Sequence, residues 1–153
     1  MAFTLDTCTL IDLSNDYPRD VFKSIWESLE SEISAGRVCI CSAVLDELKR
    51  GGDDLYKWAK SCSGLVCDTT IEDIKHAQTI SQKYPTWVNQ TKNEADPFLI
   101  AHGLAASRVV VTSERRAGSN VADHNQKVPN VADAFNVKSI NLVGLFREQG
   151  WVF

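Results

Sequence analysis

Four acidic residues from distant segments of the sequence are candidates for one shared site: Asp6, Glu47, Asp96 and Glu114. Carboxylates gathered without fixed counter-charges repel one another and raise one another's pKa, and a divalent cation relieves this repulsion. Oxygen ligands without a cooperating His or Cys suit Mg²⁺ or Mn²⁺, which commonly bridge protein carboxylates to phosphate. The expected chemistry is phosphodiester hydrolysis, because such an ion lowers the pKa of bound water and neutralises charge on the scissile phosphate.

Two of these acids lie at the carboxyl ends of segments with the pattern of buried strands. Asp6 follows residues 3–5, after which Leu10, Ile11 and Leu13 have helical spacing. Glu114 comes just after the expected buried strand at 108–112, whose centre is three valines. In open α/β sheets, ligands bind in the crevice outside the carboxyl ends of the strands. Both acids are therefore expected at that edge, although Asp6 alone could simply cap the helix that follows it.

Glu47 belongs to an expected helix over residues 43–50. At about 100° per residue, the apolar stripe of this helix centres on Val44 and Leu48, which places Glu47 on its border and Asp46 nearly opposite. Glu47 is therefore expected to face a cleft and Asp46 to face water. The alternative for Glu47 is an ion pair with a neighbouring cation on a solvated surface.

Asp96 and Pro97 open an expected helix over residues 98–106 that is apolar on nearly every side. Such a helix is buried, and proline is well placed near its start. Asp96 can therefore reach a cleft from the mouth of a buried helix. The structural alternative is that Asp96 is only the N-cap residue, which satisfies free backbone amides.

The remaining elements alternate between strands and helices, which favours an α/β class with a mainly parallel central sheet flanked by helices. We expect strands at 38–41 and 137–140, an extended segment at 65–67, loops at 14–18 and 117–130, and helices over 22–33, 53–60, 71–83, from 130, and over 141–148. In the helix from 71, the residues expected to face inward are Ile71, Ile74, Ala77 and Ile80.

Composition narrows the class of protein. A chain of 153 residues with a formal charge of -4 predicts one domain over 1–153 and argues against a broad basic face for polyanions. No charged start leads into a long apolar segment, so we expect no membrane span and a cytoplasmic location. None of the five cysteines has a histidine at a ligand-like interval nearby, so the sequence alone gives little support for zinc.

Hydroxyl and basic residues lie close to the acids in the sequence. Thr7, Thr112 and Ser113 are candidates for orienting carboxylates or water molecules from a second layer around the metal. Arg115 and Arg116 are candidates for holding flanking phosphates, although two arginines in a loop are more often simply solvated.

The segments around the four acids occur in the order of the PIN-domain motifs, and the chain resembles that family over about its whole length. These segments are residues 5–12, 44–48, 95–101 and 109–114. The resemblance implies a compact α/β nuclease that uses Mg²⁺ or Mn²⁺. It also implies an endoribonuclease similar to the toxins of toxin-antitoxin pairs, with an RNA substrate, a homodimer and an antitoxin partner.

By position in those motifs, the resemblance makes Asp6, Glu47 and Asp96 the core metal ligands. Glu114 stands where the family usually has Asp, and its longer side chain is expected to reach the metal through water. Asp123, in the following loop, is the alternative fourth acid.

Two other functions remain open. Aspartate-nucleophile phosphatases also place an Asp after the first strand, but they need a second acid two residues later, where this chain has Cys8. The other is a PIN-like nucleic-acid or protein binding module with weakened catalysis, which the negative charge and Glu114 both allow.

Overall fold

A five-stranded parallel sheet forms the centre of the protein in the computed structural model, which describes residues 1–51, 53–90 and 92–153. The strand order is β3-β2-β1-β4-β5, so β1 lies in the middle. The prediction of an α/β fold with a mainly parallel sheet is confirmed. The strands are β1 (Phe3–Leu5), β2 (Val38–Cys41), β3 (Val66–Cys67), β4 (Val109–Val111) and β5 (Ser139–Ile140).

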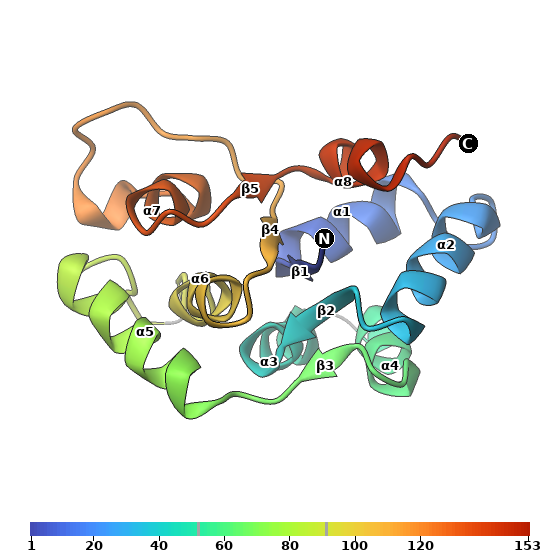
Figure 1. The fold of residues 1–153 in the computed structure, drawn as a ribbon, viewed down its shortest axis with the longest axis horizontal. Coiled ribbons are helices and arrows are strands. Elements are labelled where there is room, and N and C mark those ends of the chain that lie inside the picture. Colours follow the sequence, from blue (N-terminus) through green and yellow to red (C-terminus); the bar gives the residue numbers. More distant parts are fainter. Residues whose placement is uncertain (52, 91) are drawn as a thin grey trace.

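Helices cover both faces of this sheet (Figure 1). α6 packs directly on β1, β2 and β4, and α5 and α7 pack against α6 on the same side. α1, α2 and α8 lie on the other side. The helices of the described residues are α1 (Thr7–Asp16), α2 (Lys23–Ser34), α3 (Ser42–Gly51), α4 (Asp53–Ser61), α5 (Ile71–Lys83), α6 (Asp96–Ala105), α7 (Val128–Ala134), α8 (Leu142–Gln149) and the short 3₁₀ helix η1 (Asp123–Asn125).

The three inner strands are buried along their whole length, as expected for strands covered by helices on both faces. β1 pairs with β2 through Thr4 and Cys39, and with β4 through Thr4 and Val110. Since all the strands run in the same direction, their carboxyl ends meet at one edge of the sheet. Among the described residues, no helix has the length and apolar character that a membrane crossing requires.

The prediction of a loop at 14–18 is wrong for residues 14–16, because α1 continues to Asp16. Ser14, Asn15 and Asp16 have low helix propensity, but Leu13 in the same turn is fully buried, and this packing outweighs the local preference. The helix ends at Tyr17, whose backbone is non-helical, as expected for a residue before proline.

The inward face of α5 also differs from the prediction. Ile71 is 71% exposed and Ile74 is 45% exposed, whereas Asp73 is buried together with Ala77 and Ile80. Asp73 forms a capping box with Thr70, which fixes the first turn and turns the carboxylate toward the core. The start of α7 is a further correction, since the helix begins at Val128 rather than at Asn130.

Trp87 is buried in the core. Its indole N–H donates a hydrogen bond of 2.9 Å to the carbonyl oxygen of Gln126. This bond ties the segment before α6 to the long loop that precedes α7.

Gly103 allows α6 to approach β4 closely. A Cβ at this position would lie 2.9 Å from Val110 Cγ2 and 3.0 Å from Val137 Cγ1. Gly103→Ala is therefore expected to lower the free energy of unfolding by about 1–3 kcal/mol, as overpacked core sites do. Urea unfolding followed by circular dichroism measures the effect. The control is Gly118→Ala, where an added Cβ meets nothing within 4 Å, and equal stability of the two variants would contradict this account of the packing.

Candidate metal centre at the carboxyl edge of the sheet

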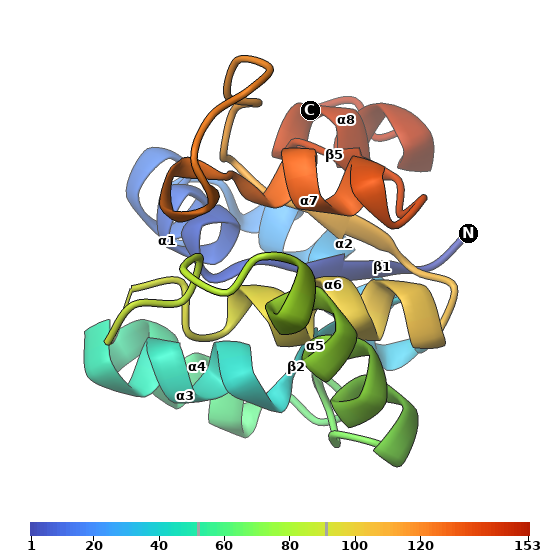
Figure 2. The same cartoon turned by 90° about the vertical axis from the view of Figure 1, so that its left-hand side faces the viewer.

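The four acids line one open cleft of about 450 Å³. In Figure 2, β1 runs from the N-terminus at the right toward α1 at the left, and α3 and the loop before α6 lie at that same end. Asp6 and Glu114 reach the cleft from the ends of β1 and β4. Glu47 reaches it from α3, and Asp96 from the start of α6.

Asp6 is buried at the floor of this cleft. Its Oδ2 atom accepts hydrogen bonds from Thr112 Oγ1 at 2.7 Å and from Cys8 Sγ at 3.1 Å. Burial raises the pKa of Asp6 to about 6, and the charges of Glu114 and Glu47 add to this rise against the hydrogen bonds. Although Asp6 occupies the N-cap position of α1, its side chain makes no capping bond, so the carboxylate is directed to the cleft.

Asp96 is the first residue of α6, one position after the N-cap residue Ala95. Burial raises the pKa of Asp96 well above its ordinary value, and the charges of Asp6, Glu114 and Glu47 raise it further. The charge of Lys127 opposes this shift. The N-cap alternative is therefore wrong, because Ala95 holds that position.

Glu47 joins three elements at the cleft. One carboxylate oxygen accepts a hydrogen bond of 2.7 Å from Thr7 Oγ1, and the other accepts one of 3.1 Å from the Ala95 backbone N–H. Glu47 is half-buried while Asp46 is exposed, as the helical periodicity predicted. Among the described residues, Glu47 forms no ion pair, and its contacts with Thr7 and Ala95 replace the surface ion pair of the alternative.

Glu114 is held by the start of α7. Its Oε2 atom accepts a hydrogen bond of 2.7 Å from the backbone N–H of Val128, at the start of α7. The Glu114 backbone N–H in turn donates to Thr112 Oγ1 at 3.2 Å. Asp123 lies in η1 and is not among the residues that line the cleft. The geometry favours Glu114 over Asp123 as the fourth acid.

Substitution separates these two candidates. Glu114→Gln is expected to weaken Mn²⁺ binding by roughly 10-fold, because it removes one carboxylate charge from the cleft while its amide oxygen still accepts the Val128 N–H bond. Asp123→Asn is expected to leave Mn²⁺ affinity unchanged. Calorimetric titration with Mn²⁺ measures both, and the reverse ranking would transfer the role to Asp123.

The remaining candidates from the sequence divide into two groups. Thr7 and Thr112 contact the carboxylates directly, as a supporting layer should. Ser113 is exposed, and no hydrogen bond joins its side chain to the four acids among the residues described. Arg116 forms a bidentate ion pair with Asp133, and neither Arg116 nor the exposed Arg115 lines the cleft.

The sequence reasoning did not place Cys8, Arg50 and Asn93 in the site, although their polar side chains belong to residues that line the cleft. Arg50 borders the cleft and pairs with Glu94 at 2.7 Å, and Cys8 donates to Asp6. Asn93 has a positive φ of 58° and donates from its side chain to the Trp87 carbonyl oxygen. The signal for Asn93 was present, since asparagine tolerates the left-handed region before a helix. No sequence pattern indicated that Arg50 or Cys8 would line the cleft, because their positions depend on contacts between elements.

The donor set fits a hard divalent cation. Four carboxylates share the cleft, and the pKa of both buried members is raised, first by burial and further by the charges of the neighbouring carboxylates. Arg50 is already paired with Glu94 near its rim. Asp6, Glu47 and Asp96, with Glu114 directly or through water, are the residues that would hold Mg²⁺ or Mn²⁺.

A protein-family model described as "Domain of unknown function (DUF4411)" matches residues 3–153. The chain belongs to the DUF4411 family. A comparison with curated proteins finds no match.

The fold of this DUF4411 domain is similar to solved structures at low sequence identity. VapBC2 from Rickettsia felis, bound to a DNA fragment from their promoter, has a TM-score of 0.57 and 18% identity over 92% of this chain and 98% of that chain. DNA-bound VapBC from Salmonella typhimurium has a TM-score of 0.55 and 22% identity over 92% and 98%. FitAcB from Neisseria gonorrhoeae has a TM-score of 0.54 and 15% identity over 91% and 96%. These matches confirm the PIN-domain fold for this DUF4411 domain.

Proposed function

We propose that this DUF4411 domain is a divalent-metal-dependent endoribonuclease that hydrolyses phosphodiester bonds of RNA in the cytoplasm. The observation that carries the proposal is the convergence of Asp6, Glu47, Asp96 and Glu114 on one cleft. Asp6 and Asp96 are buried although burial disfavours their charged form, and the pKa of each is raised as a result. A structural role would not require such an arrangement, whereas a site for a cation and a phosphate would.

The residues of the cleft have separable roles. Mg²⁺ or Mn²⁺, when bound, supplies Lewis acidity that lowers the pKa of a water molecule and neutralises charge on the phosphate. Asp6 and Asp96 provide charged oxygens from rigid elements, and Thr112 keeps Asp6 in one orientation. Thr7 and the Ala95 amide do the same for Glu47. Glu114, anchored by Val128, holds and orients a water molecule.

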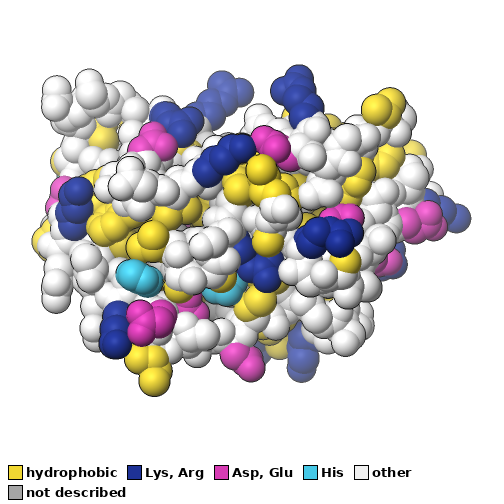
Figure 3. Space-filling view, viewed as in Figure 1, with side chains coloured by type: hydrophobic (Ala, Val, Ile, Leu, Met, Phe, Trp, Pro, Cys, Tyr) yellow, Lys and Arg dark blue, Asp and Glu magenta, His cyan; other side chains and the backbone are white. Residues whose placement is uncertain are grey.

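Substrate contacts are expected to be local. Figure 3 shows basic and acidic side chains mixed over the visible face, with hydrophobic side chains between them. Beside the cleft, Arg50 lines the wall, and Lys127 is close enough to affect Asp96. These two cations are our candidates for the phosphates that flank the cleaved bond, in place of Arg115 and Arg116.

The structural neighbours suggest a biological setting. They include VapBC and FitAB assemblies bound to DNA. Together with the PIN fold, this supports a toxin that forms a homodimer and is silenced by an antitoxin protein.

Expression of the chain alone should arrest growth, and expression of Asp6→Asn should not. Light scattering on the purified chain measures its oligomeric state.

A direct cleavage assay tests the proposed activity. Purified protein is incubated with fluorophore-labelled RNA, and with DNA of the same sequence, in buffer freed of divalent ions and then supplied with Mg²⁺ or Mn²⁺. Cleavage of RNA that depends on the added ion is the expected result. Cleavage without the ion, or intact RNA with either ion, would contradict the proposal.

The second candidate is a PIN-like nucleic-acid or protein binding module with weakened catalysis. It is favoured by Glu114, whose carboxylate is already committed to the Val128 amide, and by the formal charge of -4. A module would bind RNA or a protein partner with an affinity that Mg²⁺ leaves unchanged and would cleave nothing. Fluorescence anisotropy on labelled RNA in the same buffers distinguishes it from the nuclease.

A further inference from the structure

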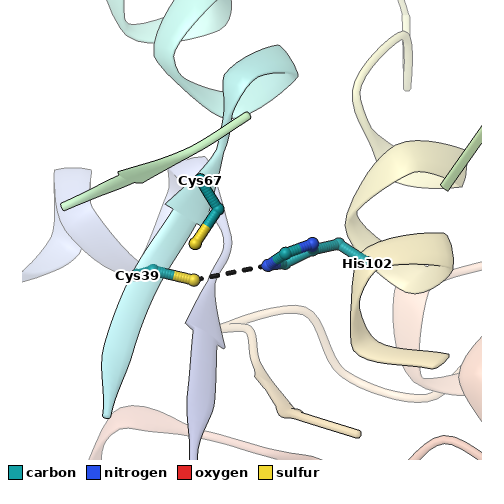
Figure 4. Close-up of side chains that lie close together, drawn as sticks. All are labelled: Cys39, Cys67 and His102. Carbon is teal, nitrogen blue, oxygen red and sulfur yellow. Dashed lines mark hydrogen bonds between the residues drawn. The ribbon is translucent and has the colours of Figure 1, made fainter. Parts of the chain in front are cut away.

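A second group of ligand-type side chains lies between the sheet and α6. Cys39 comes from β2, Cys67 from β3 and His102 from α6, and Figure 4 shows the two thiols and the imidazole directed toward one another. One ligand atom from each residue lies within 4.8 Å of the others. Cys39 and His102 are buried and Cys67 is half-buried, so the cluster is enclosed but reachable from the Cys67 side.

The spacing fits one soft metal ion. With Zn–S near 2.3 Å and Zn–N near 2.0–2.1 Å, two tetrahedral ligands of these types are about 3.5 Å apart. The distance between Cys39 Sγ and His102 Nε2 is 3.4 Å. Two sulfurs and one imidazole nitrogen select zinc over the hard cations that suit the acidic cleft.

The far side of the His102 ring faces Asp73. The distance from His102 Nδ1 to Asp73 Oδ1 is 3.5 Å, and both side chains are buried. A carboxylate behind a ligating imidazole is the usual support of a zinc-bound histidine, because it selects the tautomer whose other nitrogen binds the metal. The other oxygen of Asp73 accepts the Thr70 backbone N–H, so the carboxylate is held in this orientation.

Unsatisfied polar atoms border the same cluster. Of the three buried side-chain oxygens without a hydrogen-bond partner in the described part of the chain, two are Asp73 Oδ1 and Thr4 Oγ1. Thr4 pairs in register with Cys39 in the parallel ladder, so their side chains project from the same face of the sheet. Buried polar atoms left without partners are costly, and a cation with its ligands would compensate them.

We propose that Cys39, Cys67 and His102 bind a Zn²⁺ ion, with an oxygen of Thr4 or of a water molecule as the fourth ligand. This site is separate from the acidic cleft and does not depend on the proposed nuclease function. His102 follows Asp96 by six residues on α6, about 9 Å along the helix axis. The zinc ion would fasten α6 to β2 and to the two-residue strand β3, and so steady the helix that carries Asp96.

This inference reverses the sequence-based dismissal of zinc. The sequence offered no histidine at a ligand-like interval from a cysteine, and Cys39 and His102 are 63 residues apart. Zinc motifs are recognisable when two ligands share one turn or hairpin. Here each ligand comes from a different element, and only the packing of α6 on the sheet unites them.

Metal analysis of the purified chain tests the proposal. Protein loaded with Zn²⁺ and then gel-filtered is expected to retain about one zinc ion per chain by mass spectrometry. Co²⁺ loading should give the near-ultraviolet charge-transfer absorption of a thiolate-bound ion. In Cys67→Ser both signals should fall at least 10-fold, whereas Cys62→Ser, which changes a half-buried thiol outside the cluster, should keep them.

Two further variants complete the test. Asp6→Asn should retain zinc, which separates this site from the acidic cleft. His102→Gln should lose the thiolate absorption or shift it, and circular dichroism verifies that the variant is folded. Three results would overturn the proposal: no retained zinc in the unmodified chain, full zinc content in Cys67→Ser, or a disulfide between Cys39 and Cys67 in protein analysed without reductant.

Discussion

Asp6→Asn is expected to lower metal-dependent RNA cleavage by roughly 10³-fold, since loss of a metal-binding carboxylate removes several kcal/mol of transition-state stabilisation. The change keeps the shape of the side chain, and the new amide oxygen still accepts a hydrogen bond from Thr112. Asp96→Asn is expected to have an effect of the same order. Initial cleavage rates at saturating Mg²⁺ measure both.

The matched control lies on α3. Asp46→Asn removes the same charge from an exposed residue next to Glu47, outside the cleft of the four acids. Its cleavage rate is expected to remain within about twofold of the unmodified chain, as for a surface substitution. Full activity of Asp6→Asn, or an equal loss in Asp46→Asn, would remove the four acids from the mechanism.

The second large effect concerns stability without the cation. Asp6 has a pKa of about 6 in the folded chain against an ordinary value of 3.8, so the folded state binds this proton more tightly than the unfolded state. Ionised Asp6 therefore destabilises the fold, fully above about pH 6 and progressively less as the pH falls toward 3.8. In magnesium-free buffer at pH 8, Asp6→Asn is expected to raise the free energy of unfolding on the order of 1–3 kcal/mol.

The pH dependence and the metal provide two checks on this expectation. The difference between Asp6→Asn and the unmodified chain should shrink when urea unfolding is repeated at pH 4.5. Excess Mg²⁺ at pH 8 should stabilise the unmodified chain and leave Asp6→Asn nearly unchanged, because a ligand stabilises only the state that binds it. A variant less stable than the unmodified chain at pH 8 would show that burial of the charge is not what raises the pKa.

Elements with a strong local pattern could be predicted from the sequence. The short segments that became β1, β2 and β4 are rich in apolar residues because helices cover both faces of the sheet, and this pattern identifies buried strands. The rule that ligands gather at the carboxyl ends of parallel strands then placed Asp6 and Glu114 at one edge. Helical periodicity separated Glu47 from Asp46.

Predictions failed where packing between elements outweighed local preference. α1 extends through polar residues because Leu13 is buried, and α5 turns Asp73 inward while Ile71 is exposed. The contacts of the basic residues also depend on packing between elements, since Arg116 meets Asp133 and Arg50 reaches the cleft. The periodicity of one segment does not specify which side chains of another segment will contact it in the folded chain.

The residue types and their order along the chain thus specified the α/β class, the parallel sheet and the four acids at its edge, because these follow from periodicity and strand direction. The side chains that hold each acid, and the meeting of Cys39, Cys67 and His102, were decided by the packing of α6 and α7 on the sheet. Hydrogen bonds and metal ligands require positions within a few tenths of an ångström, which only the assembled fold provides.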